Sequence, residues 1–97
     1  MSRTKGNLAF DHATKSLDIL ANRHRLVILN LLEKRDYSPE ELAIECRLDL
    51  SSVSQHLSLL QRSGFITNFG EGNSIRFKVK EQRINELLKS MQKKSLG

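Results

Sequence analysis

A stripe of apolar residues between positions 50 and 60 constrains the fold of this chain more than any other feature. Its members recur at intervals of three or four residues: Leu50, Val53, Leu57 and Leu60. This spacing predicts a helix with one face buried against another element. Asp49 stands where its carboxylate can cap the first turn, and Gly64 stands where a left-handed residue ends many helices. The sequence therefore predicts a capped amphipathic helix over residues 50–63.

A shorter helix is expected directly before this one. Ser38, Pro39 and Glu41 form a start signal, with a serine N-cap, a proline at the first helical position and a glutamate that completes a capping box. Arg47 and Leu48 leave room only for a tight connection. The side chains that the shorter helix is expected to bury are Leu42, Ala43 and Cys46. Two short helices joined in this way predict a helix-turn-helix over residues 38–63.

The remaining segments divide into helices and one hairpin. Residues 8–21 and 81–94 show helical spacing of apolar residues, whereas Arg23–Lys34 is apolar over more than half of its circumference and is the expected central core helix, capped by Asn22. After Gly64 the apolar period changes to two, which predicts strands around a glycine-rich tip within residues 65–79. Residues 1–7 are polar, and we expect them to be disordered.

The expected fold is mainly α with a small β-hairpin. It is a winged helix-turn-helix whose wing is residues 65–79, with an additional helix at each end. The chain of 97 residues supports a single domain with one modest core, which we place at residues 8–94.

The face of the 50–63 helix opposite the apolar stripe carries short, mostly uncharged side chains. They are Ser51, Ser54, Gln55, Ser58 and Arg62. Such a face suits insertion into the major groove of DNA, where side chains must reach the edges of bases. The formal net charge of +5 favours a polyanionic partner only weakly by itself, but it agrees with this face. Double-stranded DNA is therefore the expected partner.

Several stretches of the chain resemble the ArsR/SmtB family of winged-helix transcriptional regulators. They are residues 20–29 (LANRHRLVIL), 41–43 (ELA), 53–60 (VSQHLSLL) and 64–66 (GFI), and the resemblance extends over roughly residues 17–79. It implies a homodimeric repressor that binds a pseudo-palindromic operator.

The terminal helices build the dimer interface in such proteins. The residues that the resemblance assigns to this role are Leu8, Phe10, Leu17, Ile84, Leu87, Leu88 and Met91. A small domain with two otherwise unsupported amphipathic ends also has reason to bury them against a second copy.

Candidate DNA contacts divide into base readout and phosphate binding. The residues expected to face bases are Ser51, Ser54, Gln55 and Ser58, and the Gln55 amide can form a bidentate pair with adenine. The residues expected at phosphates are Ser38, Ser52, Arg62, Arg76 and Lys78. A solvated strand face is the competing interpretation for Arg76 and Lys78, since the tip of this wing lacks the cations that are common in the family.

Two further residues near these surfaces have competing interpretations. His56 lies nearer the buried stripe, so a structural hydrogen bond is expected rather than a DNA contact. Phe69 stands close to the wing tip, where it either packs against its own hairpin or contacts a partner.

Neither of the family's familiar metal sites is present in the sequence. The thiolate site requires Cys-x-Cys on the helix before the recognition helix, where this chain has only Cys46; the other site uses histidines on the last helix, and residues 81–94 contain none. A soft metal needs two to four converging thiolates. We therefore expect no metal and no cofactor. Cys46 is expected to be a small buried hydrophobe, and a lone-thiol redox-responsive regulator would need an exposed thiol of lowered pKa.

Other classes of function receive little support. No glycine-rich phosphate loop follows a strand and no nucleophile–base pair is discernible, so we expect no enzyme. No apolar run reaches the ~20 residues of a membrane span, no secretory signal is evident, and one cysteine fits a reducing cytosol. A cytoplasmic protein is therefore expected. The main alternative is a winged-helix module that binds another protein, and a protein partner or inducer of unidentified class remains open.

Overall fold

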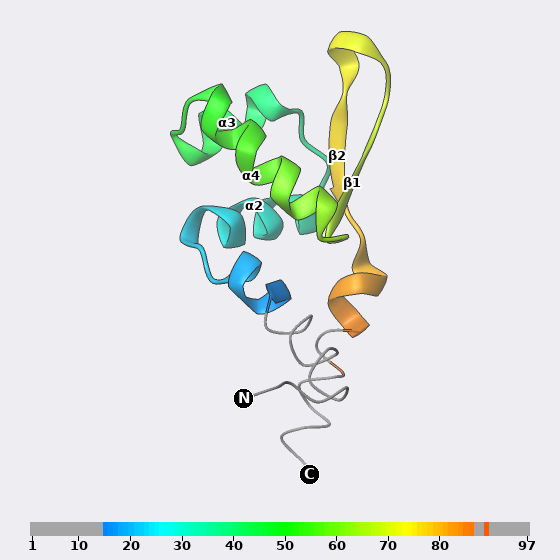
Figure 1. Ribbon diagram of the computed structural model, residues 1–97. Helices are drawn as coiled ribbons and strands as arrows, with labels where there is room; N and C mark the ends of the chain where they lie inside the picture. Colours follow the sequence, from blue (N-terminus) through cyan, green and yellow to red (C-terminus); the bar gives the residue numbers. More distant parts are fainter. Residues whose placement is uncertain (1–14, 87–88, 90–97) are drawn as a thin grey trace.

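The computed structural model describes residues 15–86 and 89, and shows three short helices followed by a hairpin (Figure 1). The elements are α2 (Arg23–Lys34), α3 (Pro39–Cys46), α4 (Leu50–Arg62), β1 (Ile66–Phe69), the 3₁₀ turn η1 (Gly72–Ser74) and β2 (Arg76–Val79). This order confirms the predicted winged helix-turn-helix.

Helical residues also flank these elements at both ends. Residues 15–20 and 81–86 are helical, and they lie together at the end of the molecule opposite the hairpin tip (blue and orange in Figure 1). The described residues of these helices include Leu17 and Ile84. The predicted disordered tail and the predicted interface residues Leu8, Phe10, Leu87, Leu88 and Met91 lie outside the described residues.

Each of the three central helices begins at a residue with a capping side chain. Asn22 Oδ1 accepts the backbone N–H of Arg25 at 3.1 Å. In α3, Ser38 Oγ accepts the N–H of Glu41 at 3.1 Å and Glu41 Oε1 accepts the N–H of Ser38 at 3.0 Å, which is the predicted capping box. Asp49 caps α4. These bonds satisfy donors that a helix start otherwise leaves unpaired.

The helix ends follow from backbone conformation. Arg47 adopts a left-handed conformation (φ 55°) and begins the three-residue connection (47–49) from α3 into α4. Gly64 is left-handed as predicted (φ 82°); its N–H bonds the Gln61 carbonyl, and the N–H of Phe65 bonds the Leu60 carbonyl, both at 3.0 Å. This pair of bonds is a Schellman motif, which directs the chain from α4 into the wing.

One core joins the helices to the wing. Its buried members are Ile28, Leu29, Leu32, Tyr37, Leu42, Val53, Leu57, Leu60, Phe65, Ile66 and Phe77. They come from α2, α3, α4, both strands and the adjoining residues Tyr37 and Phe65, so α4 and the wing are stabilised by the same packing. Each fully buried aliphatic or aromatic side chain contributes roughly 1.5–3 kcal/mol relative to exposure.

The wing is slightly shorter than predicted and is joined by a segment that the sequence did not indicate. β1 and β2 are antiparallel, with Ile66 opposite Val79 and Phe69 opposite Arg76. Tyr37, in the connection between α2 and α3, forms an isolated bridge with Phe77 through two backbone hydrogen bonds of 2.8 and 3.2 Å. The loop before α3 is therefore tied to the inner strand of the wing.

Ala43 and Cys46, which were expected to be buried, are half-buried, and three larger apolar residues are exposed. Leu26 and Val27 on α2 retain 50% and 39% of their exposure, and Leu50 retains 45%. Only one side of α2 packs against the rest of the described domain, and Ile28, Leu29 and Leu32 are buried there. The apolar residues on the other sides of this helix are therefore not buried by the described residues. Leu50 is the first residue of α4, and it extends beyond the core.

Candidate nucleic-acid interface

The two faces of α4 separate by polarity. Ser51, Ser54, Gln55 and Ser58 are all exposed, whereas Val53, Leu57 and Leu60 are buried. The exposed four recur at helical spacing, so they form one continuous strip of short hydrogen-bonding groups. The structure thus brings together the four residues that the sequence predicts for base readout.

The start of this strip is fixed by Asp49. Its Oδ1 accepts the backbone N–H of Ser52 at 2.9 Å. Hydrogen bonds from the Ser52 hydroxyl and from its backbone N–H lower the pKa of Asp49, so the capping carboxylate stays ionised. Ser52 is half-buried, and its backbone N–H is bonded to the cap, so it is a weaker candidate for a phosphate contact than the exposed serines.

The middle of α4 is held against α2 by a histidine. Nδ1 of His56 lies 3.2 Å from Nη1 of Arg25, and Nε of Arg25 donates to the Ile19 carbonyl at 2.5 Å. The His24 ring lies 5.7 Å from the His56 ring, centroid to centroid. Burial lowers the pKa of His56, and the nearby Arg25 and His24 lower it further. His56 therefore makes the structural hydrogen bond that the sequence predicts.

Arg62 lies at the other end of α4 from Ser51. The two residues are eleven positions apart, which is roughly 16 Å along a helix axis. The Arg62 side chain is exposed, and its Nε lies 3.4 Å from the Ser58 carbonyl of the preceding turn. It lines a cavity beside the terminal helices with Arg83. Arg62 is therefore far from the first turn of α4, and its predicted phosphate contact would lie at the other end of the helix.

Arg76 was predicted to contact phosphate or to lie on a solvated strand face, but in the structure it bonds carboxylates of the same domain. Its guanidinium is half-buried and bonds Asp36 Oδ1 at 2.5 Å, the Asp36 carbonyl at 3.1 Å and Glu41 Oε1 at 2.8 Å. Asp36 chiefly, and then Glu41, raise the pKa of Arg76. Arg76 thereby joins β2 to the loop before α3 and to the capping box, since Glu41 also accepts from Ser38. The alternation of strand side chains could not indicate carboxylates that stand 40 and 35 positions earlier.

The Glu41 carboxylate is the shared acceptor of this network. The backbone N–H of Ser38 chiefly, and then Arg76 and Arg35, lower the pKa of Glu41. Nη1 of Arg35 lies 3.6 Å from Glu41 Oε1, and its guanidinium carbon stacks 3.8 Å from the centroid of the Tyr37 ring. Ser38 Oγ accepts the N–H of Glu41 as the helix cap, which leaves its O–H group able to donate to a phosphate oxygen, so its phosphate contact stays a prediction.

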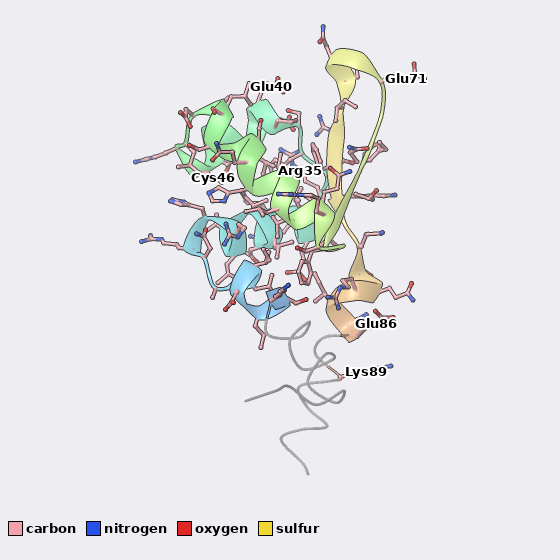
Figure 2. The ribbon with its side chains drawn as sticks, viewed as in Figure 1. Arg35, Glu40, Cys46, Glu71, Glu86 and Lys89 are labelled. Atoms are coloured by element: carbon pink, nitrogen blue, oxygen red, sulfur yellow. The ribbon has the colours of Figure 1, made fainter. Side chains whose placement is uncertain are left out.

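The outer part of the wing carries little positive charge. Lys78 is exposed, and its Nζ lies 5.5 Å from the centroid of the Phe69 ring. Phe69 itself keeps 40% of its exposure, so packing against its own hairpin and contact with a partner both stay predictions. Glu71, the only charged residue between Phe69 and Arg76, lies at the tip (Figure 2). Lys78 is thus the one predicted wing cation with an exposed side chain.

Cys46 ends α3, beside the turn into α4 (Figure 2). It is half-buried against the core, and this burial, with the nearby Glu45, raises the pKa of its thiol. A raised pKa lowers the thiolate fraction, and the thiolate is the reactive form. Within residues 15–86 and 89, no three His, Cys, Asp or Glu side chains gather in a metal-binding group. No helix in that part of the chain is long and apolar enough to cross a membrane.

Comparison with known proteins gives a consistent result. The family model described as "Bacterial regulatory protein, arsR family" matches residues 22–68, from the cap of α2 into β1. An uncharacterised HTH-type transcriptional regulator of Mycobacterium tuberculosis, Rv0081, is 37% identical over 70 residues, which are 71% of this chain and 61% of that protein. The transcriptional activator HlyU of Vibrio cholerae is 29% identical over 72 residues, covering 74% of this chain and 67% of HlyU.

Solved structures agree with the sequence relatives. The crystal structure of M. tuberculosis Rv0081 has a TM-score of 0.72 and 31% identity, with 95% of this chain and 89% of that chain covered. A homodimeric winged helix-turn-helix DNA-binding domain from Mycobacterium bovis has a TM-score of 0.75, covering 98% of this chain and 90% of that chain; its identity is 22%, so it supports the fold alone. The chain belongs to the ArsR family of bacterial regulatory proteins.

Proposed function

We propose that this chain is a sequence-specific DNA-binding transcriptional regulator that reads its operator with α4. The observation that carries the proposal is the exposed strip of Ser51, Ser54, Gln55 and Ser58 on a helix whose opposite face is buried. Short uncharged side chains on a rigid helix can approach base edges in the major groove. Gln55 is the proposed main base-reading residue, and Lys78 is the proposed phosphate contact from the wing.

The regulator is proposed to act as a homodimer on a pseudo-palindromic operator in the cytoplasm. The terminal helices lie at the end opposite the wing tip, so a second copy bound there leaves the wing uncovered (Figure 1). Leu17 supports this role with 40% exposure, whereas Ile84 is already partly buried against its own core. The two copies of α4 would then enter successive major grooves, ~34 Å apart.

The DNA-binding proposal is tested by fluorescence anisotropy with the region upstream of the gene for this protein. We expect operator affinity about 10³-fold or more above that for random DNA of equal length. We also expect this affinity to fall steeply between about 50 and 200 mM salt, because bound phosphates release counterions. Equal affinity for both DNAs would contradict the proposal and favour a protein-interaction module.

The dimer is tested by light scattering on the full chain. One protomer has a mass of 11.1 kDa, so a dimer would have about 22 kDa (2 × 11.1). Leu17→Asp is expected to shift the mass toward the protomer, whereas Leu26→Asp, on the exposed side of α2, is the matched control. An 11 kDa species that still binds the operator would contradict the dimer.

We further propose that binding represses transcription. A reporter under the control of the operator should become more active when the gene for this protein is deleted. Lower activity after the deletion would instead indicate an activator, which is what HlyU of V. cholerae is named.

A further inference from the structure

A cavity of about 560 Å³ opens where the end of α4 meets the two terminal helices. Its described lining is Lys15, Ser16, Asp18, Ile19, Arg62, Ser63 and Arg83. The volume lies within the range of small-molecule sites. The DNA-binding proposal uses none of the residues that line this cavity and leaves it without a role.

The described lining is positively charged. Lys15, Arg62 and Arg83 contribute three positive charges and Asp18 one negative charge, which leaves a net charge of +2 (3 − 1). Within the part of the chain that the structure describes, the ion pairs involve Arg35 and Arg76 but none of these three cations. Among the described residues no carboxylate pairs with them, so their charge would attract an anion that enters the cavity.

Arg83 is the positioned member of this group. Its Nη2 donates to Ser16 Oγ at 2.7 Å and its Nε to the Ser63 carbonyl at 3.3 Å, while its guanidinium carbon lies 5.2 Å from the centroid of the Phe65 ring. A guanidinium has five N–H donors, and these two bonds use two of them. Arg83 is thus held in place by the described residues with donors to spare.

We propose that this cavity binds a small organic anion that carries a carboxylate or phosphate group on a compact apolar body. The anionic group would bond Arg62 and Arg83, with Lys15 adding charge. The apolar body would contact Ile19 and the aliphatic parts of the basic side chains. A preorganised guanidinium favours planar oxygen groups, because it can donate two parallel hydrogen bonds.

The walls of this site come from α4 and from both terminal helices. A ligand that contacts all three elements binds best to one relative arrangement of them, and so favours that arrangement. The anion site itself does not depend on DNA binding. A small anion bound in the cavity would thereby change the position of α4 relative to the terminal helices.

The experiment is a titration of the full chain, without DNA, followed by the backbone amide shifts in NMR spectra. Benzoate and phenyl phosphate are the probes, and benzamide is the neutral isostere of benzoate. We expect saturable shifts at Ser16, Ile19 and Ser63 with one or both anions and none with benzamide. The anion that binds more tightly shows whether the cavity prefers a carboxylate or a phosphate group.

Variants localise the binding. Arg62→Gln, which removes a largely exposed side chain, is expected to weaken binding about fivefold or more, and Lys15→Gln to weaken it less. Lys34→Gln, at the far end of α2, is the matched control and should leave the affinity unchanged. No saturable shifts, equal shifts with benzamide, or shifts that Arg62→Gln leaves intact would each overturn the proposal. Since no DNA is present, such a failure is independent of the proposed DNA binding.

Discussion

The exposed face of α4 and the outer part of β2 were both predicted to contact DNA, but they differ in whether their polar side chains are already bonded within the domain. Ser51, Ser54 and Gln55 extend from α4 as exposed side chains. On β2, Arg76 instead bonds Asp36 and Glu41 within the same domain. A DNA phosphate would have to replace those bonds, which reduces the net gain from contact.

This difference assigns separate tasks to the two regions. The α4 strip is available for recognition, whereas Arg76 positions the wing relative to α3 through the capping box. Lys78 is the exposed cation that remains on β2. The wing is therefore expected to contribute modest electrostatic affinity, and α4 most of the discrimination between sequences.

The largest expected effect concerns the core that the two regions share. Leu60→Ala should lower the free energy of unfolding by roughly 2–5 kcal/mol, because Leu60 is fully buried between the helices and the wing. Urea unfolding measures this. Ser54→Ala, on the exposed face of the same helix, is the control and should stay within about 0.5 kcal/mol of wild type. Equal losses would mean that the two faces of α4 are not separated as described.

The next effect distinguishes the two basic residues of β2. Lys78→Gln should reduce the slope of log affinity against log salt by about one, as expected for one lost phosphate contact. Arg76→Gln should leave the slope nearly unchanged and should lower the unfolding midpoint more than Lys78→Gln does. The slopes are measured by anisotropy. If Arg76→Gln reduced the slope and Lys78→Gln left it unchanged, Arg76 would have to leave its bonds within the domain to bind DNA.

A smaller effect concerns the attachment of α4 to α2. Burial holds the pKa of His56 below its ordinary value of 6.5, so as the pH falls through that value the unfolded chain takes up the proton first. The folded state consequently loses stability on acidification. The free energy of unfolding should fall more between about pH 7.5 and 5.5 in wild type than in His56→Gln. Parallel curves for the two proteins would argue against this assignment.

No effect is expected from soft metals. The chain has one cysteine, and the pKa of its thiol is raised by burial. Zinc, cadmium and arsenite should therefore leave operator affinity unchanged in anisotropy titrations. Stoichiometric release of DNA by any of them would contradict the predicted absence of a metal site.

The features that sequence predicted correctly depend on neighbouring residues. The caps at Asn22, Ser38 and Asp49 and the left-handed Gly64 each depend on chemistry within one helical turn. The four exposed polar residues of α4 follow from a single helical period. Helical spacing also correctly indicated that His56 makes a structural bond, although not that Arg25 is its partner.

The features that sequence missed depend on long-range contacts. The bridge from Tyr37 to Phe77 and the bonds of Arg76 join segments about 40 residues apart, so only the folded chain determines which partner each group finds. The exposure of Leu26 likewise depends on where the neighbouring elements pack. The cavity beside Arg83 was missed for the same reason, because its lining comes from three separate segments.

The most direct test of the central claim compares two glutamines of α4. Gln55 lies on the exposed strip, and Gln61, also exposed, lies near the end of the helix toward the terminal helices. The ratio of operator affinity to random-DNA affinity is measured for Gln55→Ala and Gln61→Ala. Gln55→Ala should lose about 1–3 kcal/mol of discrimination, while Gln61→Ala keeps the wild-type ratio. An unchanged ratio in Gln55→Ala, or an equal loss in both variants, would contradict base recognition by this strip.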